Sequence, residues 1–236
     1  MVSLQRVTID VRQVQGEKIV LRDEQGHYLR RVLRLESGDR FIAMDGVGKW
    51  WLAQLTGDEA QILEPLEVRT ELPVSVTLII ALPKGNGFDD VVRSCTELGV
   101  SCITPVLSER TLLNPSPQKL ERWRRIATEA AEQSERAFVP TVLEPVSFNM
   151  AISEAGANHR FLCEARGEIP HFSQKVNSLS GEIIIATGPE GGWTPTEIET
   201  ARNHGFQPVS LGKRILRAVT APIVALSLAA ASLENV

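Results

Sequence analysis

The sequence predicts an α/β protein in which a small β-barrel precedes a parallel, helix-covered sheet. Residues 1–70 contain short apolar segments at close spacing, separated by turn sequences, which is typical of a small barrel. From residue 74 onward, apolar segments alternate with amphipathic ones, which is typical of strands and helices in a parallel α/β sheet. Hydrophobic residues make up 43% of the chain and charged residues 23%, as expected for domains with buried cores.

In the first part we expect strands at Phe41–Met44, Trp50–Leu55 and Gln61–Val68, because each is an apolar or β-branched segment bounded by turn residues. The sequence Glu71-Leu72-Pro73 is a plausible linker, because proline disfavours a helix before it and has no N–H to donate to a strand. Residues 1–70 and 74–236 are therefore predicted to be separate domains.

In the second part, Val76–Leu82 is continuously apolar, as a strand covered on both faces must be. Further strands are expected at Ser101–Val106, Phe161–Cys163 and Glu182–Thr187. Helices are expected at Phe88–Leu98, Lys119–Arg136 and Thr220–Leu233.

Charge and composition exclude several classes of protein. The net charge of −4 means that any contact with nucleic acid must depend on local basic clusters. The start of the chain lacks the apolar core of a signal peptide, and the apolar stretch Ala218–Leu233 is too short to span a membrane. Cys95, Cys102 and Cys163 form no CxxC pair, so reduced thiols are expected and no disulfide or metal site. We therefore expect a cytoplasmic protein without a membrane partner.

The strongest motif is Gly188-Pro189-Glu190-Gly191-Gly192-Trp193, directly after an apolar strand. Thr194-Pro195-Thr196-Glu197 follows it and has the pattern of a helix capping box with proline in the first turn. The turn therefore lies at the carboxyl end of a strand, where open α/β sheets bind ligands, and its glycines allow the backbone to approach one closely. The alternative is a tight turn without a ligand.

Two cationic segments accompany this motif. Leu211-Gly212-Lys213-Arg214-Ile215-Leu216-Arg217 precedes an apolar helix that needs cover on several sides, and its cations suit a ligand or an RNA phosphate. Lys84, in Leu82-Pro83-Lys84-Gly85, also follows a strand and could meet an anion, although a solvated lysine is the simpler interpretation.

Two further polar segments have ordinary structural alternatives. His27-Tyr28-Leu29-Arg30-Arg31-Val32-Leu33-Arg34 puts Arg30 and Arg34 on one helical face, which is either a phosphate-binding surface or a solvated one. Glu132 and Arg136 are spaced as an i,i+4 pair, which favours a surface ion pair over a wall of a substrate site.

Together these motifs resemble the RsmE family of 16S rRNA (uracil-N3)-methyltransferases. The resemblance rests on HYLRRVLR, LPKG, TELGV (residues 96–100), SER (108–110), AEQSER (131–136), GPEGGW and LGKRILRAVTA (211–221), in that order along nearly the whole chain. It implies a PUA-like RNA-binding barrel followed by a SPOUT domain with a deep trefoil knot. It also implies a homodimer that uses S-adenosyl-L-methionine to methylate N3 of uridine 1498 in 16S rRNA of the small ribosomal subunit.

The resemblance also assigns site residues. The cofactor is expected to contact Leu162, Glu164, Thr187, Gly188, Pro189, Glu190, Gly191, Gly192, Leu211, Gly212, Ile215 and Leu216. The RNA is expected to contact His27, Arg30, Arg31, Arg34, Lys84, Arg136, Lys213 and Arg214.

The chemistry suggests candidates for two catalytic roles. Methylation removes the N3 proton of uridine, and the resulting charge spreads over two carbonyl oxygens that a guanidinium can stabilise. Arg217 and Arg110 are the candidates for that role, and Glu132 or Glu190 for receiving the proton.

The chain departs from the family pattern at Val219, where the family has glutamate, and at Arg93, where it has lysine. Val219 leaves a second hypothesis open, namely a knotted RNA-binding protein with weak or no catalysis. A third is a small-molecule α/β enzyme that binds a nucleotide at the glycine turn, which leaves the basic segment of the barrel unexplained.

Overall fold

The computed structural model describes residues 4–111, 115–177 and 179–234, which form two compact units. The N-terminal unit comprises the described residues up to Glu71 together with Ala131–Val139, and the α/β unit comprises Leu72–Ala130 and Pro140–Val236. The outermost residues of the two predicted domains, 1–3 and 235–236, lie outside the described residues. The chain therefore passes between the units three times rather than once.

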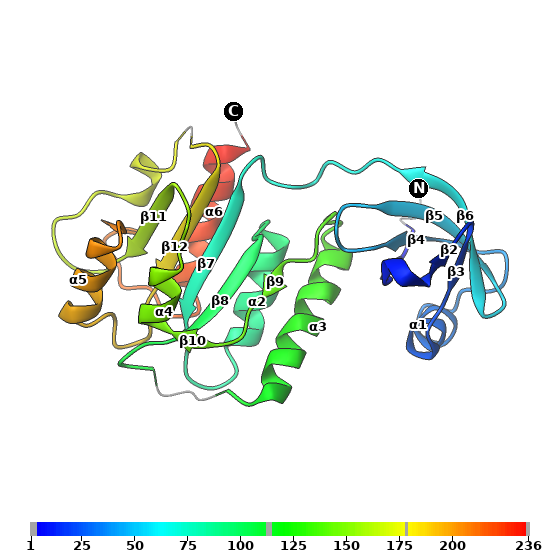
Figure 1. Ribbon diagram of the computed structural model, residues 1–236, viewed down its shortest axis with the longest axis horizontal. Helices are drawn as coiled ribbons and strands as arrows, with labels where there is room; N and C mark the ends of the chain where they lie inside the picture. Colours follow the sequence, from blue (N-terminus) through cyan, green and yellow to red (C-terminus); the bar gives the residue numbers. More distant parts are fainter. Residues whose placement is uncertain (1–3, 112–114, 178, 235–236) are drawn as a thin grey trace. The chain divides into compact units, whose positions relative to one another are not determined.

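The N-terminal unit is built on a six-stranded sheet with the order β1-β4-β5-β6-β3-β2 (Figure 1). The pairings are antiparallel except for β1 with β4. Its strands are β1 (Arg6–Thr8), β2 (Val14–Gln15), β3 (Lys18–Val20), β4 (Arg40–Met44), β5 (Trp50–Thr56) and β6 (Glu59–Leu66). The three strands predicted from the sequence are confirmed as β4, β5 and β6.

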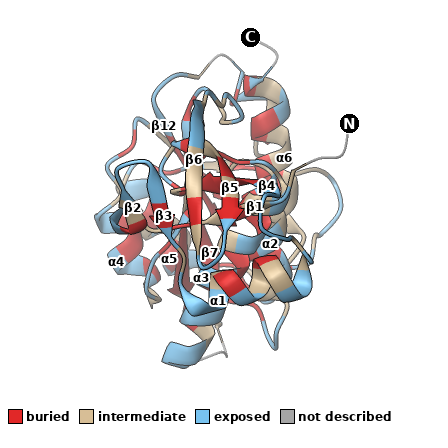
Figure 2. Cartoon of the chain, turned by 90° about the vertical axis from the view of Figure 1, so that its right-hand side faces the viewer, coloured by how far each residue is buried: buried red, intermediate tan, exposed pale blue. Residues whose placement is uncertain are grey.

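This sheet has to curl, because its two edge strands are joined by a very short segment. Strands lie about 4.8 Å apart, so a flat sheet of this order would separate β1 from β2 by roughly 24 Å. Only residues 9–13 connect them, and Val11–Gln13 form a compact 3₁₀ turn, η1. Buried residues concentrate on β4 and β5, whereas the second half of β6 is exposed (Figure 2).

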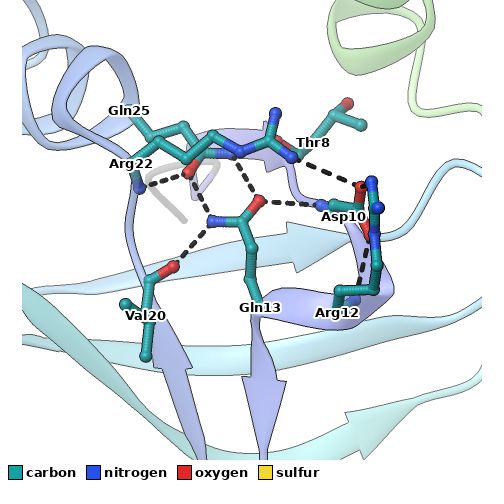
Figure 3. A network of polar contacts seen from close by, with 7 residues as sticks. All are labelled: Thr8, Asp10, Arg12, Gln13, Val20, Arg22 and Gln25. Carbon is teal, nitrogen blue, oxygen red and sulfur yellow. Dashed lines mark hydrogen bonds and ion pairs between the residues drawn. The ribbon is translucent and has the colours of Figure 1, made fainter.

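Side-chain amides hold the two edges together (Figure 3). Gln13 Nε2 donates to the Val20 carbonyl oxygen at 2.7 Å and to Gln25 Oε1 at 2.8 Å, while Gln25 Nε2 donates to the Thr8 carbonyl oxygen at 2.8 Å. These bonds provide donors for the backbone carbonyls of Thr8, in the edge strand β1, and of Val20, in β3. They link β1, η1, β3 and α1 (Asp23–His27).

The basic segment is not the single helix that its spacing predicts. After α1 the chain forms a π-helical turn, η2 (Tyr28–Val32), and Leu33 caps it. Arg34 follows with φ +59°, in the left-handed region that ends a helix. The prediction that Arg30 and Arg34 share a helical face is therefore wrong, because the helix ends before Arg34.

The residues from the middle of the chain that belong to the N-terminal unit form a strap, Ala131–Val139. The Val139 amide donates to the Gly46 carbonyl at 2.9 Å, and the Gly48 amide donates to the Ala137 carbonyl at 3.0 Å. The guanidinium of Arg136, 3% exposed, forms an ion pair with Glu71. The strap thus provides hydrogen-bond partners for the turn between β4 and β5 and an ion-pair partner for Glu71, the last residue of the unit's first segment.

The α/β unit contains a parallel sheet with the order β10-β8-β7-β12-β11-β13, with β9 paired to β8 (Figure 1). All of its pairings are parallel, as predicted. The strands are β7 (Ser75–Ala81), β8 (Cys102–Leu107), β9 (Thr141–Val142), β10 (Val146–Ser147), β11 (His159–Cys163), β12 (Glu182–Thr187) and β13 (Gln207–Val209).

Helices of this unit pack their apolar residues against the sheet and one another. α2 (Phe88–Glu97) buries Phe88, Val91, Val92 and Cys95, which recur at helical spacing. The others are α3 (Pro117–Gln133, whose last residues enter the strap), α4 (Phe148–Ser153), α5 (Pro195–Asn203), α6 (Ala221–Leu233) and the 3₁₀ turn η3 (Phe172–Gln174). The three predicted helices are confirmed as α2, α3 and α6. Among the described residues, no helix combines the length and apolarity needed to cross a membrane.

Candidate functional site

Three loops that follow neighbouring strands line one pocket of about 730 Å³ in the α/β unit. Because β12 pairs with β11 and β11 pairs with β13, all in parallel, the loops after these strands leave the same edge of the sheet. The lining residues include Cys163–Ile169 after β11, Gly188–Trp193 after β12, and Leu211, Gly212 and Arg214–Leu216 after β13. The sequence rule that ligands bind at strand carboxyl ends therefore identifies this pocket.

The glycine turn after β12 is fixed at both ends. The Gly192 amide donates to the Pro189 carbonyl at 2.9 Å, and Gly192 has φ +70°, a conformation that other residues rarely adopt. Immediately beyond it, Thr194 caps α5 in a reciprocal capping box with Glu197, as the sequence predicted.

Trp193 packs under the turn. Its indole stacks on Phe148 with ring centroids 4.2 Å apart, and its Nε1 donates to the Cys163 carbonyl at 3.2 Å. A Cβ atom on Gly188 would lie only 3.1 Å from this ring. The side chain is 5% exposed and joins the loops after β11 and β12.

Two carboxylates and one guanidinium connect the glycine turn and the first turn of α5 to loops after other strands. Glu190 Oε1 accepts from the Lys84 amide at 2.9 Å, in the loop after β7. Glu197 Oε1 accepts from the Glu109 amide at 2.9 Å, in the loop after β8. Arg110 Nη1 in turn donates to the Gly191 carbonyl at 2.6 Å, so Arg110 stands at the wall of the pocket.

The loop after β13 contributes an apolar wall with cations beside it. The hydroxyl of Ser210 exchanges hydrogen bonds with the backbone of Gly212, whose φ is +122°. Leu211 and Leu216 line the pocket together with Ile215, which is 71% exposed. An apolar side chain this exposed beside a pocket suits contact with a flat apolar group.

The residues that line the pocket fit a nucleoside-sized ligand that has both a positively and a negatively charged group. Carboxylates (Glu164, Glu168, Glu190) and guanidinium groups (Arg110, Arg166, Arg202, Arg214) line the same pocket as the apolar residues. The volume lies within the range of small-molecule sites, roughly 300–1,000 Å³. Such a wall offers anions to a sulfonium or ammonium group and cations to a carboxylate.

Two further polar groups lie at the ends of β12 and β11, beside the loops that line the pocket. The Thr187 hydroxyl, at the end of β12, is fully buried and has no hydrogen-bond partner among the described residues. Burial raises the pKa of the Cys163 thiol to about 12, so this pocket-lining thiol stays protonated near neutral pH. A protonated thiol is a poor nucleophile, so it is compatible with an electrophilic ligand.

Most of the predicted cofactor residues meet in this pocket. All line it except Leu162, which is fully buried in β11, and Thr187. Of the predicted catalytic and RNA-binding arginines, Arg110 and Arg214 line it, whereas the exposed Arg217 is not among the lining residues.

Two predicted site residues have other contacts. Glu132 Oε1 accepts from the Thr8 amide at 2.6 Å in the N-terminal unit, and Glu132 does not line the pocket. Arg136 was predicted to bind RNA, but it is buried and its guanidinium is paired with Glu71. A buried, paired guanidinium does not reach a phosphate, so we assign Arg136 to the strap of the N-terminal unit.

The basic segment of the N-terminal unit lines a separate pocket of about 620 Å³. His27, Arg30 and Arg31 lie in its wall, with Asp23, Glu36 and Asp58 beside them. Arg30 pairs with Asp58 at 3.0 Å, so part of its charge is already neutralised. Lys84 and Lys213 are exposed in the α/β unit.

Several pocket residues were not identified from the sequence. They include Ala165–Ile169 after β11, Trp193, Pro195, Ile198 and Arg202 at and within α5, and Ala218 and Ala221. The loop after β11 obeys the same strand-end rule as the glycine turn, so its position was an available signal. The α5 residues carry no such signal, because only the fold brings the helix beside the loop.

Comparison with known proteins defines the class. A family model described as an RNA methyltransferase domain matches residues 70–230, and one described as an RNA methyltransferase PUA domain matches residues 21–63. The chain is therefore an RNA methyltransferase.

The chain belongs to the ribosomal RNA small subunit methyltransferase E family, as the motifs predicted. It is 50% identical to the family member of Synechocystis sp. over 98% of this chain and 78% of that protein. It is 32% identical to the member of Bacillus subtilis over 95% of both chains.

Solved structures support the fold. A methyltransferase from Legionella pneumophila in complex with the cofactor SAM is similar with a TM-score of 0.88 and 30% identity, over 98% of both chains. Ribosomal RNA small subunit methyltransferase E from Neisseria gonorrhoeae, bound to S-adenosyl methionine, is similar with a TM-score of 0.84 and 34% identity, over 95% of both chains. The predicted SPOUT fold with an N-terminal PUA-like barrel is confirmed.

Proposed function

We propose that this protein transfers a methyl group from S-adenosyl-L-methionine to N3 of uridine 1498 in 16S rRNA, within the cytoplasm. The observation that supports this most directly is the pocket in which three strand-end loops combine apolar walls, both signs of charge and Arg110. Relatives solved with the cofactor share this fold over nearly the whole chain.

The cofactor is proposed to bind to residues of the three loops. The carboxylates of Glu164 and Glu190, which line the pocket, would face positively charged groups of the cofactor. When bound, the cofactor supplies a methyl group that is already activated on a sulfonium. The protein then has to position the reacting atoms and exclude water, and backbone groups of the glycine turn suit that task because no side chain intervenes. Leu162 and Thr187 contribute from beneath, through the packing of β11 and β12.

For the substrate we propose that Arg110 and Arg217 stabilise the charge that appears on the uracil oxygens as the N3 proton leaves. Arg110 is held at the pocket wall by the Gly191 carbonyl, whereas the exposed Arg217 follows the apolar residues after β13. Glu190 is the proposed proton acceptor, since it lines the pocket, in place of Glu132, which binds the Thr8 amide.

For RNA we propose phosphate contacts from His27, Arg30, Arg31 and Arg34 in a PUA-like domain of residues 1–70. Lys84, Lys213 and Arg214 would add contacts from the methyltransferase domain, residues 74–236. Each phosphate contact that is lost should weaken binding and reduce the slope of log affinity against log salt by about one. Arg31→Ala, an exposed residue, is the cleanest single test of the barrel surface.

We also propose a homodimer that uses α6. Pro222, Ala225 and Leu226 are buried within the chain, but Ile223, Val224 and Leu228 are only partly buried. A helix apolar on all sides is stabilised when a second chain covers the remaining residues. Sedimentation of wild type and of Leu228→Lys measures this, and a wild-type monomer at micromolar concentration would exclude the dimer.

The decisive experiment measures methyl transfer. Purified protein, labelled S-adenosyl-L-methionine and small subunits from cells that lack this methylation should give labelled 16S rRNA. Reverse transcription should stop at the modified uridine, because N3 lies on its base-pairing edge. Cofactor binding without transfer would instead support the alternative of a knotted RNA-binding protein that has lost catalysis.

Val219 does not by itself favour that alternative. Its side chain packs on Gly87, where an added Cβ atom would lie 2.7 Å from Val219 Cγ1, and Val219 is not among the lining residues of the pocket. A valine at this position is therefore compatible with the pocket described above.

A further inference from the structure

The buried carboxylate of Glu197 makes two contacts, and the helix that carries it needs only one of them. Glu197 is 3% exposed. Its Oε2 accepts from the Thr194 amide at 2.8 Å and completes the capping box at the start of α5. Its Oε1 accepts from the amide of Glu109 at 2.9 Å, across a separation of 88 residues. The second contact has no part in capping the helix.

The amide of Glu109 belongs to the tight turn that presents Arg110. The Thr111 amide donates to the Ser108 carbonyl at 3.0 Å, and the hydroxyls of the same two residues lie 2.9 Å apart. Glu197 anchors the backbone of the turn, and the Gly191 carbonyl anchors the guanidinium of Arg110. Both anchors come from the chain segment between β12 and the first turn of α5.

We propose that Glu197 is a positioning residue that holds Arg110 at the pocket by fixing the backbone of its turn. This inference rests on the role proposed above for Arg110. Glu197 does not line the pocket, and both of its carboxylate oxygens accept from backbone amides, so it acts through Arg110 rather than on the substrate. A carboxylate is required, because two N–H donors face two separate oxygens.

Glu197→Gln tests this without changing the size of the side chain. Glutamine offers one carbonyl oxygen and one NH₂ group, so one of the two amides is left facing a donor. The matched control is Thr194→Ala, which removes the hydroxyl that accepts from the Glu197 amide at 3.2 Å but keeps both carboxylate contacts. Thr194→Ala weakens only the start of α5. In Glu197→Gln the amides of Thr194 and Glu109 compete for a single carbonyl oxygen, so the link to Glu109 is weakened as well.

Glu197→Gln is expected to lower kcat for small-subunit methylation on the order of tenfold, since small displacements of a reacting group are costly in rate. The Kd for S-adenosyl-L-methionine, measured by calorimetry, should stay within about twofold, because Glu197 does not line the pocket. Thr194→Ala should lower Tm by a similar amount and leave kcat unchanged. Equal losses of kcat in both variants would overturn the inference and indicate general damage to α5.

A double-mutant cycle identifies the route of the effect. In the Arg110→Ala background, Glu197→Gln should cause no further loss of kcat, because the group that it positions is already absent. A further loss of the same factor would overturn the inference while leaving the proposed role of Arg110 intact. If Arg110→Ala alone kept the wild-type kcat, the proposed role of Arg110 would be overturned. The inference that Glu197 acts through Arg110 would then be overturned as well.

Trypsin gives a readout that does not need activity. Cleavage after Arg110 should be severalfold faster in Glu197→Gln than in wild type or Thr194→Ala, because the turn has lost its backbone anchor. Equal cleavage rates in all three proteins would show that Glu197 does not hold the turn, whether or not the protein methylates RNA.

Discussion

Replacing Trp193 by phenylalanine should loosen the floor of the pocket by an amount that the structure allows us to estimate. The indole N–H that donates to the Cys163 carbonyl would be lost, which removes about 1 kcal/mol and leaves that carbonyl without this donor. The smaller ring would still stack on Phe148 but would leave a gap beneath Gly188, for about 1–2 kcal/mol more. We expect a total loss of about 2–3 kcal/mol in the free energy of unfolding.

Urea unfolding followed by circular dichroism measures this loss, and calorimetry measures the accompanying change in cofactor affinity. The matched control is Trp51→Phe in the N-terminal unit, where a half-buried indole has no hydrogen bond recorded among the described residues. The control should lose less than about 1 kcal/mol. A loss in Trp193→Phe that does not exceed that of Trp51→Phe would refute the account of the indole as the link between two pocket loops.

Three further predictions concern other parts of the chain. Glu71→Ala should destabilise the protein by about 3 kcal/mol, because it removes the carboxylate that pairs with the buried Arg136 guanidinium. Glu67→Ala, from an exposed pair, should change stability by less than about 1 kcal/mol in the same urea titration. Gly192→Ala should lower cofactor affinity and Tm, because alanine is strained at φ +70°; unchanged calorimetric Kd and Tm would contradict this. Burial raises the pKa of Cys95 from 9.0 to about 12, so the folded state keeps a proton that the unfolded state loses, and stability should fall as pH rises from about 9 towards 12. Between pH 8 and 10 the wild type should lose about 1 kcal/mol more than Cys95→Ala, and parallel pH profiles of the two proteins would contradict that assignment.

The central part of the fold was predictable because its signals are local. Val76–Leu82 and Glu182–Thr187 are apolar over the length of a strand, and the structure places them side by side as β7 and β12. The strands β1, β2 and β3 are two or three residues long, too short for any alternation to be recognised, so they were missed. Arg34 was misplaced because helical spacing does not reveal where a helix ends.

The candidate site was predictable where it depends on strand ends and not where it depends on distant contacts. The glycine turn and the loop after β13 were expected to line a ligand site, and both line the same pocket. The i,i+4 spacing of Glu132 and Arg136 predicts a surface ion pair, and it does not reveal that Glu132 accepts from the Thr8 amide or that the buried Arg136 pairs with Glu71. The contact of Glu197 with Glu109 spans 88 residues, so only the folded chain reveals it.

The strap Ala131–Val139 has a consequence for dissecting the protein. A gene fragment that stops at Glu71 would encode the whole curled sheet but not the backbone groups of Ala137 and Val139 that close its β4–β5 turn, nor the cation opposite Glu71. Transplanting the front part into another enzyme would therefore require grafting a second, non-contiguous peptide. A domain boundary chosen from sequence similarity alone would yield a fragment in which Glu71 lacks Arg136 and the β4–β5 turn lacks its backbone hydrogen bonds to the strap.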